Sequence, residues 1–218
     1  MAIVAIKQDN YWDIINCATK LLKDDGIVAY PTETFYGIGA RYDSEKALKR
    51  IVSIKKRPEE KAFPLIVGSI EALALVVKSI NDIERALIEE FWPGPLTILF
   101  EAKAGLLPLI CLHGKVAVRL TGNKVAMDLS ITLGCPISST SANVSSMPPA
   151  RDAPTVHAYF RDGVDLIIDG GTTEGGLPST IVSVKGGMIE IVRNGPIDLR
   201  GFCKDKGLMI GYNVGHLT

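Results

Sequence analysis

Apolar residues recur along this chain first at helical and then at extended spacing. The first helical stripe consists of Ile14, Ile15, Ala18, Leu21 and Leu22. Their intervals of three and four predict a helix over residues 9–25. The apolar run at 27–30 predicts a short buried strand, which ends at Pro31 because proline has no N–H to donate. Residues 32–39 are then expected to form a loop at the carboxyl end of that strand.

The same spacing rules predict the elements that follow. Helices are expected over 70–78, 82–91 and 123–133, and over a segment capped at Asp43 or Ser44 with its last turn at 55–58. Strands are expected at 64–67, 96–100 and 116–120, from 136 into a polar loop at 143, at 165–169, and as a hairpin of 180–184 with 188–193. Strands that alternate with helices and end in a hairpin predict a single α/β domain with a mixed sheet over residues 1–218.

Composition narrows the class of protein. The 218 residues include 24 basic and 24 acidic side chains and are 47% hydrophobic, which is typical of a compact globular chain. The zero formal net charge argues against a main task of coating nucleic acid, because that work needs a large basic surface. Its four cysteines are widely spaced and lack zinc-ligand spacing, which predicts reduced thiols in a cytoplasmic protein. No apolar run has the length of a membrane span, so no membrane association is expected.

Polar clusters follow several of the predicted strands. They consist of Thr32, Thr34 and Tyr36, of residues 138–143, and of Ser179 with Thr180. Ligands favour the carboxyl ends of strands, so these clusters are candidates for one site.

Five cations are candidates for the same site. They are Lys55, Arg57, Lys61, Arg119 and Arg193. Arg119 and Arg193 stand in or at the end of apolar strands, where a buried guanidinium needs an anionic partner. A ligand or a neighbouring carboxylate can fill that role for Arg119. Hydroxyls, an amide and convergent cations together suit a polyanion that carries a small polar group, which indicates a nucleotide.

Several familiar catalytic motifs are missing from the sequence. The chain has neither the P-loop pattern nor the glycine spacing of a Rossmann turn, and its three histidines show no triad or metal spacing. The turn at 92–97 is interpreted as structural and left outside the site. The sequence therefore supports neither P-loop nor Rossmann phosphate binding, and it supports no His-centred nucleophile or metal site.

Seven segments in order resemble the successive motifs of the YrdC family, the threonylcarbamoyl-AMP synthases. They are Pro31–Gly39, Ile54–Pro58 with Lys61, Trp92–Thr97, Val116–Arg119, Ser141–Asn143, Ser179–Val182 and Arg193–Gly195. The resemblance runs from about residue 10 to residue 200. It implies a YrdC-like fold, in which a twisted mixed β-sheet curls around a cationic cleft with flanking helices. It also implies condensation of L-threonine, bicarbonate and ATP to threonylcarbamoyl-AMP and pyrophosphate, the first step of N6-threonylcarbamoyladenosine formation in tRNA.

Carried over to this sequence, the resemblance assigns residues to two ligands. L-Threonine is expected to bind Thr34, Arg119, Ser141 and Ser179. ATP, with Mg²⁺ on its triphosphate, is expected to bind Lys55, Arg57, Lys61, Asn143 and Arg193. Lys55 and Arg57 are expected to position the reactants and to stabilise charge. A downstream tRNA threonylcarbamoyl-transferase machinery and weak tRNA binding are the implied partners.

The chain also departs from the family pattern. Ser146 stands where the family usually has glycine, and the sequence lacks the additional C-terminal domain of longer members, so it resembles the short form. Two alternatives remain at this point: a domain that forms a carbamoyl-adenylate from carbamoyl phosphate, and a non-catalytic RNA-binding module.

Overall fold

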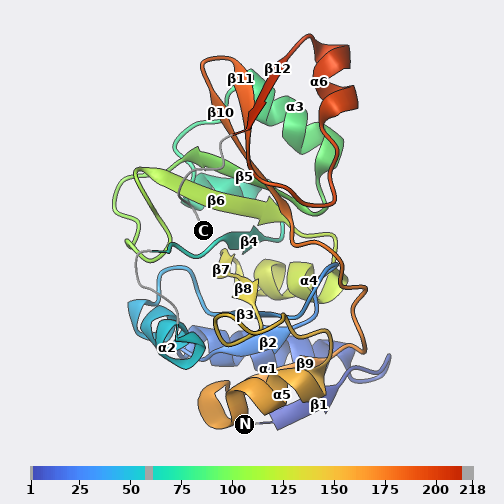
Figure 1. Ribbon diagram of the computed structural model, residues 1–218. Helices are drawn as coiled ribbons and strands as arrows, with labels where there is room; N and C mark the ends of the chain where they lie inside the picture. Colours follow the sequence, from blue (N-terminus) through green and yellow to red (C-terminus); the bar gives the residue numbers. More distant parts are fainter. Residues whose placement is uncertain (1, 57–60, 213–218) are drawn as a thin grey trace.

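A computed structural model describes residues 2–56 and 61–212 of the chain (Figure 1). Its helices are α1 Tyr11–Lys23, α2 Glu45–Lys55, α3 Asp82–Phe91, α4 Lys124–Leu133, α5 Ala153–Phe160 and α6 Arg200–Lys206, with 3₁₀ turns η1 Glu71–Leu75 and η2 Arg161–Gly163. Its strands are β1 Ala2–Ala5, β2 Val28–Tyr30, β3 Gly37–Gly39, β4 Leu65–Val67, β5 Leu96–Glu101, β6 Lys115–Leu120, β7 Ile137–Ser138, β8 Thr140–Ser141, β9 Leu166–Asp169, β10 Thr180–Lys185, β11 Met188–Arg193 and β12 Met209–Tyr212. No helix in these ranges has the length and apolar character needed to cross a bilayer.

Hydrogen bonding divides the strands between two mixed sheets. The five-stranded sheet has the order β1-β9-β2-β3-β8, and the seven-stranded sheet has the order β12-β11-β10-β5-β6-β4-β7. Parallel pairs such as β5 with β10 occur beside antiparallel pairs such as β5 with β6. The predicted mixed α/β class is therefore confirmed, with two sheets where the spacing rules indicated one.

The two sheets share hydrophobic cores. One core places Ile38 of the five-stranded sheet with Leu65 and Val118 of the seven-stranded sheet, and all three are fully buried. A second core lies under α1 and α4 and again takes side chains from both sheets, including Val28 and Ile66. Full burial of each such aliphatic side chain contributes about 1.5–3 kcal/mol, so the apolar contacts between the sheets hold them together.

Helix termini follow the predicted caps. Ser44 begins α2, and its hydroxyl accepts a hydrogen bond from the Ala47 N–H at 3.2 Å. Asn123 begins α4 and accepts from the Val125 and Ala126 N–H groups, while Gly134 ends this helix in the left-handed conformation. These caps fix where α4 starts relative to β6, the strand that precedes it.

Three expectations about local structure are wrong. Residues 37–39, expected to be loop, form β3 of the five-stranded sheet, because the glycines allow the chain to approach Ser138 and Tyr30 closely. The helix expected over 70–78 is a 3₁₀ turn at Glu71–Leu75. The short elements β1, α5, α6 and β12 were not anticipated from the pattern. In α5, Asp152 caps the helix and proline stands in its first turn, where it is tolerated.

Replacement of Gly39 by alanine is expected to disrupt β3. A Cβ at this position would lie 1.9 Å from the Ser138 carbonyl oxygen, which is backbone and has little freedom to shift. We expect Gly39→Ala to lower the free energy of unfolding by about 3 kcal/mol or more in urea denaturation. Gly201→Ala in α6 is the matched control, because its Cβ would meet no atom within 4 Å. Equal stability of the two variants would contradict this account of β3.

Candidate functional site

The turn after β2 presents two threonine hydroxyls held by local hydrogen bonds. The Thr32 hydroxyl donates to the Phe35 carbonyl at 2.6 Å and accepts from the Thr34 N–H at 3.3 Å. The Thr34 carbonyl accepts from the Gly175 N–H at 2.7 Å, which ties the turn to the segment before β10. The predicted ligand residue Thr34 is therefore half-buried in a braced turn with its hydroxyl within reach of Thr32.

Lys55 holds the polar loop that follows β8. This side chain is buried, and its ammonium donates to the Ser141 carbonyl at 2.5 Å, to the Asn143 carbonyl at 2.7 Å and to Asn143 Oδ1 at 3.3 Å. The Ser141 hydroxyl donates to the same Oδ1 at 2.6 Å. Lys55, Ser141 and Asn143, predicted separately, thus form one hydrogen-bonded group at the end of α2.

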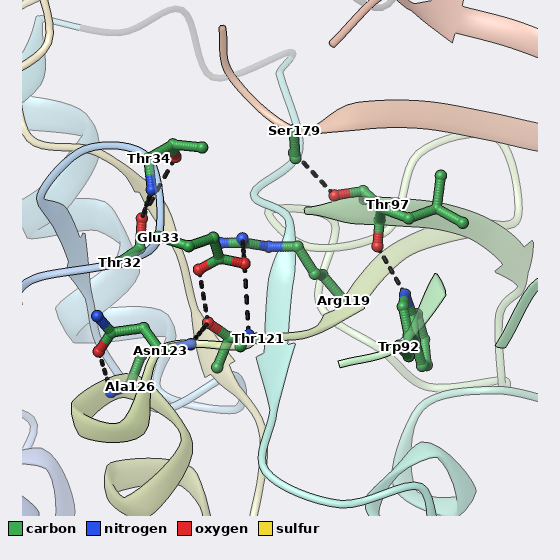
Figure 2. Close-up of polar contacts among 12 residues, drawn as sticks. Thr32, Glu33, Thr34, Trp92, Thr97, Arg119, Thr121, Asn123, Ala126 and Ser179 are labelled. Carbon is green, nitrogen blue, oxygen red and sulfur yellow. Dashed lines mark hydrogen bonds and ion pairs between the residues drawn. The ribbon is translucent and has the colours of Figure 1, made fainter. Parts of the chain in front are cut away.

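A second group lies at the ends of β10 and β11. Arg193 donates through Nε and Nη2 to the Ser179 carbonyl at 3.0 and 2.9 Å, and through Nη2 to the Ser179 hydroxyl at 2.9 Å. That hydroxyl also lies 3.0 Å from Oγ1 of buried Thr97 on β5 (Figure 2). Ser179 and Arg193 are therefore in contact, as expected for two residues of one site.

Glu33 connects the turn after β2 to β6 of the other sheet. As Figure 2 shows, its carboxylate points toward Arg119 and Thr121. Oε1 pairs with the Arg119 guanidinium, and Oε2 accepts from the Thr121 hydroxyl at 2.8 Å. The Gly122 N–H makes a longer contact of 3.4 Å with Oε1. The carboxylate that a buried strand arginine requires is thus supplied by the protein itself.

The second guanidinium lacks such a carboxylate. Among the described residues, Arg193 makes hydrogen bonds only to Ser179, whose acceptors are neutral. Burial, together with the nearby charge of Arg119, lowers the pKa of Arg193 to about 10. An anion bound beside Arg193 would relieve both effects, so this position favours a negatively charged ligand group.

Two buried tyrosines flank the turn after β2: Tyr30 is the last residue of β2, and Tyr36 directly precedes β3. The Tyr36 hydroxyl donates to the Gly171 carbonyl at 2.8 Å and accepts from the Gly170 N–H at 3.1 Å. Burial raises the pKa of Tyr36 to about 12 and that of Tyr30, which lies near the Glu33–Arg119 pair, to about 12 as well. Both phenols therefore stay protonated at neutral pH and act as neutral hydrogen-bonding groups.

A cavity of about 720 Å³ opens beside the same turn. Its lining includes Thr32 and Glu33 together with Asp169, Glu174 and Lys124. Three carboxylates against one ammonium make this cavity unsuited to a polyphosphate. The position that suits a polyphosphate is instead the one beside the positively charged guanidinium of Arg193.

The structure brings five of the predicted site residues into two hydrogen-bonded groups, Lys55 with Ser141 and Asn143, and Arg193 with Ser179, while Arg119 pairs with Glu33. Arg57 lies outside the described residues, and half-buried Lys61 directly follows the undescribed segment 57–60, so their roles stay predictions. Sequence reasoning missed Glu33, Thr97 and Thr121. A signal was present, because the strand arginine required a carboxylate and Glu33 stands between two threonines already singled out.

Ser146 adopts the conformation that glycine favours. Its φ of 71° lies in the left-handed region, which costs a non-glycine residue about 1–2 kcal/mol. The loop from Ser141 to Met147 nevertheless stays closed, since the Asn143 amide donates to the Met147 carbonyl at 2.6 Å. Serine at this position therefore holds a left-handed backbone conformation at a cost in stability.

Within residues 2–56 and 61–212, no three His, Cys, Asp or Glu side chains converge closely enough to hold a metal ion.

Comparisons with known proteins agree with this geometry. A family model described as "Telomere recombination", which covers Sua5, YciO and YrdC, matches residues 20–195. Threonylcarbamoyl-AMP synthase of Klebsiella pneumoniae is 37% identical over 167 residues, which are 75% of this chain and 87% of the relative. The protein of the same name from Pyrococcus abyssi is 36% identical over 172 residues, or 78% of this chain.

The fold agrees as closely with a solved structure. P. abyssi Sua5 complexed with L-threonine superposes with a TM-score of 0.89 and 31% identity, and the match covers 96% of this chain and 62% of that one. This chain spans about half of the Pyrococcus relative, since the sequence match covers 50% of its length. Residues 20–195 of this chain, which the family model matches, include all the polar groups described above.

Loss of the Lys55 ammonium is expected to loosen the loop after β8. Lys55→Met would remove the ammonium that donates to the Asn143 carbonyl and one of two donors to the Ser141 carbonyl, at a cost of about 1–3 kcal/mol in the free energy of unfolding. Hydrogen exchange of the amides at 143–147 should accelerate as well. Lys46→Met is the matched control on α2, because Lys46 is exposed and makes only a 3.8 Å surface pair with Asp25. Indistinguishable exchange in the two variants would contradict the bracing role of Lys55.

Proposed function

This chain belongs to the Sua5, YciO and YrdC family, and from that premise we propose that it is an L-threonylcarbamoyladenylate synthase. It condenses L-threonine, bicarbonate and ATP to threonylcarbamoyl-AMP, pyrophosphate and water. The relatives at 36–37% identity carry the name threonylcarbamoyl-AMP synthase, and the Sua5 structure was solved with L-threonine bound.

One observation carries the proposal. Arg119 and Arg193 lie near each other and are partly or fully withdrawn from solvent, yet only Arg119 is paired with a carboxylate. The hydroxyls of Ser179 and Thr97 lie beside Arg193. The paired guanidinium of Arg119 and the nearby hydroxyls suit a small amino acid, and the guanidinium of Arg193, which has no carboxylate partner, suits an adjacent phosphate chain.

The chemistry follows from holding these reactants together. The amine of threonine attacks the carbon of bicarbonate, one C–O bond breaks, and the hydroxyl leaves with an amine proton as water, which gives a carbamate. With CO₂ the amine adds directly and releases one proton. A carbamate oxygen then attacks the α-phosphorus of ATP, the bond to the β-phosphate breaks, and pyrophosphate leaves. No protein nucleophile takes part, so the rate depends on alignment and on cations that neutralise charge developing on the phosphates.

We assign the ligands as the sequence indicated. Threonine binds Thr34, Arg119, Ser141 and Ser179, with its carboxylate on Arg119. The nucleotide binds Lys55, Arg57, Lys61, Asn143 and Arg193. Because Lys55 is engaged with the loop at 141–143, its contribution includes placing Ser141 and Asn143 against their ligands.

The remaining assignments rest on the proposed reaction. Mg²⁺ enters with the triphosphate and shields its charge. The product passes to a tRNA threonylcarbamoyl-transferase machinery, with weak tRNA binding by this protein, and the reaction takes place in the cytoplasm. Likeness to HypF structures, at 21% identity for the full-length protein, supports a common fold only, so a carbamoyl-adenylate activity is not favoured. An RNA-binding module is not favoured either, given zero net charge.

Pyrophosphate release tests the proposed function directly. The protein should release pyrophosphate from ATP only when L-threonine and bicarbonate are both present, and L-serine should support a lower rate. A coupled pyrophosphatase assay with single omissions measures this. Release without threonine, or an equal rate with every amino acid, would contradict the proposal.

Arg119→Lys separates the two ligand positions. Lysine keeps the charge but loses the planar guanidinium, so the variant should fold and bind threonine about 10- to 150-fold more weakly, equivalent to about 1.5–3 kcal/mol. ATP binding measured without threonine should change little. Calorimetric titration of each ligand measures both quantities. An equal loss of ATP affinity would place Arg119 in the phosphate site.

A further inference from the structure

We propose that Glu33 is a positioning residue that reserves Arg119 for the amino-acid carboxylate and keeps the phosphate chain on Arg193. The inference rests on the proposed function and assigns a role to a residue that the motif comparison left without one.

The carboxylate fixes one side of the guanidinium. Glu33 pairs with Nη1 of Arg119, and its other oxygen is held by the Thr121 hydroxyl, which itself accepts from the Asn123 N–H at 3.2 Å. The Arg119 side chain is only 9% exposed and that of Glu33 20% exposed, so the pair is largely withdrawn from water. The cap of α4 thus determines where Glu33 lies, and Glu33 determines the orientation of Arg119.

The other side of the guanidinium stays open for a ligand. Within the described part of the chain, Arg119 makes no hydrogen bond through Nε or Nη2. The only fully buried side-chain nitrogen or oxygen without a partner there is Thr19 Oγ1, so these two nitrogens retain contact with solvent. A carboxylate can therefore bind their N–H groups while Glu33 holds Nη1.

Charge balance then distinguishes the two arginines. Arg119 with Glu33 is neutral as a pair, and the α-amino acid that binds it is a zwitterion of zero net charge. Arg193 has no carboxylate partner among the described residues, and its positive charge suits a polyanion. Without the negative charge of Glu33, both guanidiniums would attract phosphate, and ATP would compete with threonine for Arg119.

The substitution Glu33→Gln should therefore change the two affinities in opposite directions. Threonine should bind about tenfold more weakly. Its ammonium and carboxylate charges nearly cancel, so the removed charge of Glu33 changes its attraction to the site little, and the lost orientation of Arg119 dominates. Inorganic pyrophosphate should bind about fivefold more tightly, as expected for removal of one opposing charge in a solvated site. The gain for pyrophosphate should shrink in 0.5 M salt, whereas the loss for threonine should persist.

The experiment is calorimetric titration of L-threonine and of inorganic pyrophosphate into the full chain. Asp128→Asn on α4 is the matched control. Like Glu33, Asp128 forms an ion pair, here with Lys124, and accepts a hydrogen bond from a hydroxyl, here that of Tyr11. The control substitution also removes one negative charge, and it should leave the affinities for threonine and for pyrophosphate within about twofold of the unsubstituted protein. In the pyrophosphate-release assay, Glu33→Gln should raise the KM for threonine far more than it lowers kcat.

Thr121→Val provides a second variant that keeps all charges. It removes one anchor of the Glu33 carboxylate, and we expect weaker threonine binding with unchanged pyrophosphate binding. Tighter threonine binding by Glu33→Gln would overturn the proposal, because Glu33 would then compete with the substrate for Arg119. Unchanged affinities in both variants would overturn it too. Wild-type protein that binds no threonine would instead overturn the proposed function on which it rests.

Discussion

The ion pair between Glu33 and Arg119 is the interaction on which the geometry of the site depends. It joins a turn of the five-stranded sheet to a strand of the seven-stranded sheet, between residues 86 positions apart in the chain. Two charges withdrawn from water lose solvation that their mutual attraction alone does not fully restore. The Thr121 hydroxyl and the Gly122 N–H supply further hydrogen bonds to the carboxylate. The pair is therefore better understood as a device for placing groups than as a source of stability.

The other buried cations show the same preference for placement. Lys55 is bound by carbonyl and amide oxygens of residues 141 and 143, and Arg193 by the backbone and hydroxyl of Ser179. At Arg193, neutral acceptors fix the direction of the guanidinium without compensating its charge, so the charge remains available to a ligand. Withdrawing such cations from water costs free energy of folding, and the apolar packing shared by the two sheets offsets that cost.

Sequence pattern predicted the elements whose signals are local. The cap at Ser44 and the stop at Gly134 are where the pattern indicated, and both glycines of the 185–187 turn have positive φ, as a tight hairpin requires. Pattern failed where tertiary contact overrides local preference. β3 is a strand because Gly39 fits against the Ser138 carbonyl and Gly37 against the Tyr30 and Ser139 side chains, and no propensity scale contains that information. The pairing of Glu33 with Arg119 likewise depends on how two sheets face each other.

A reaction without a protein nucleophile places unusual demands on this kind of placement. When reactants attack one another, the protein contributes chiefly by alignment, and an error of about 1 Å can cost about a hundredfold in rate. The relevant side chains here come from β6, β8, β11, α2 and the loops after β2, after β8 and before β10, so no single element aligns them. Alignment must instead pass through contacts between elements: Lys55 to the loop after β8, Arg193 to Ser179, and Glu33 to Arg119. This explains why Lys55 and Arg193 are hydrogen-bonded to neutral backbone and side-chain groups of other elements. It also explains why the residue that links the two sheets at Arg119 is a carboxylate in a site otherwise suited to anions.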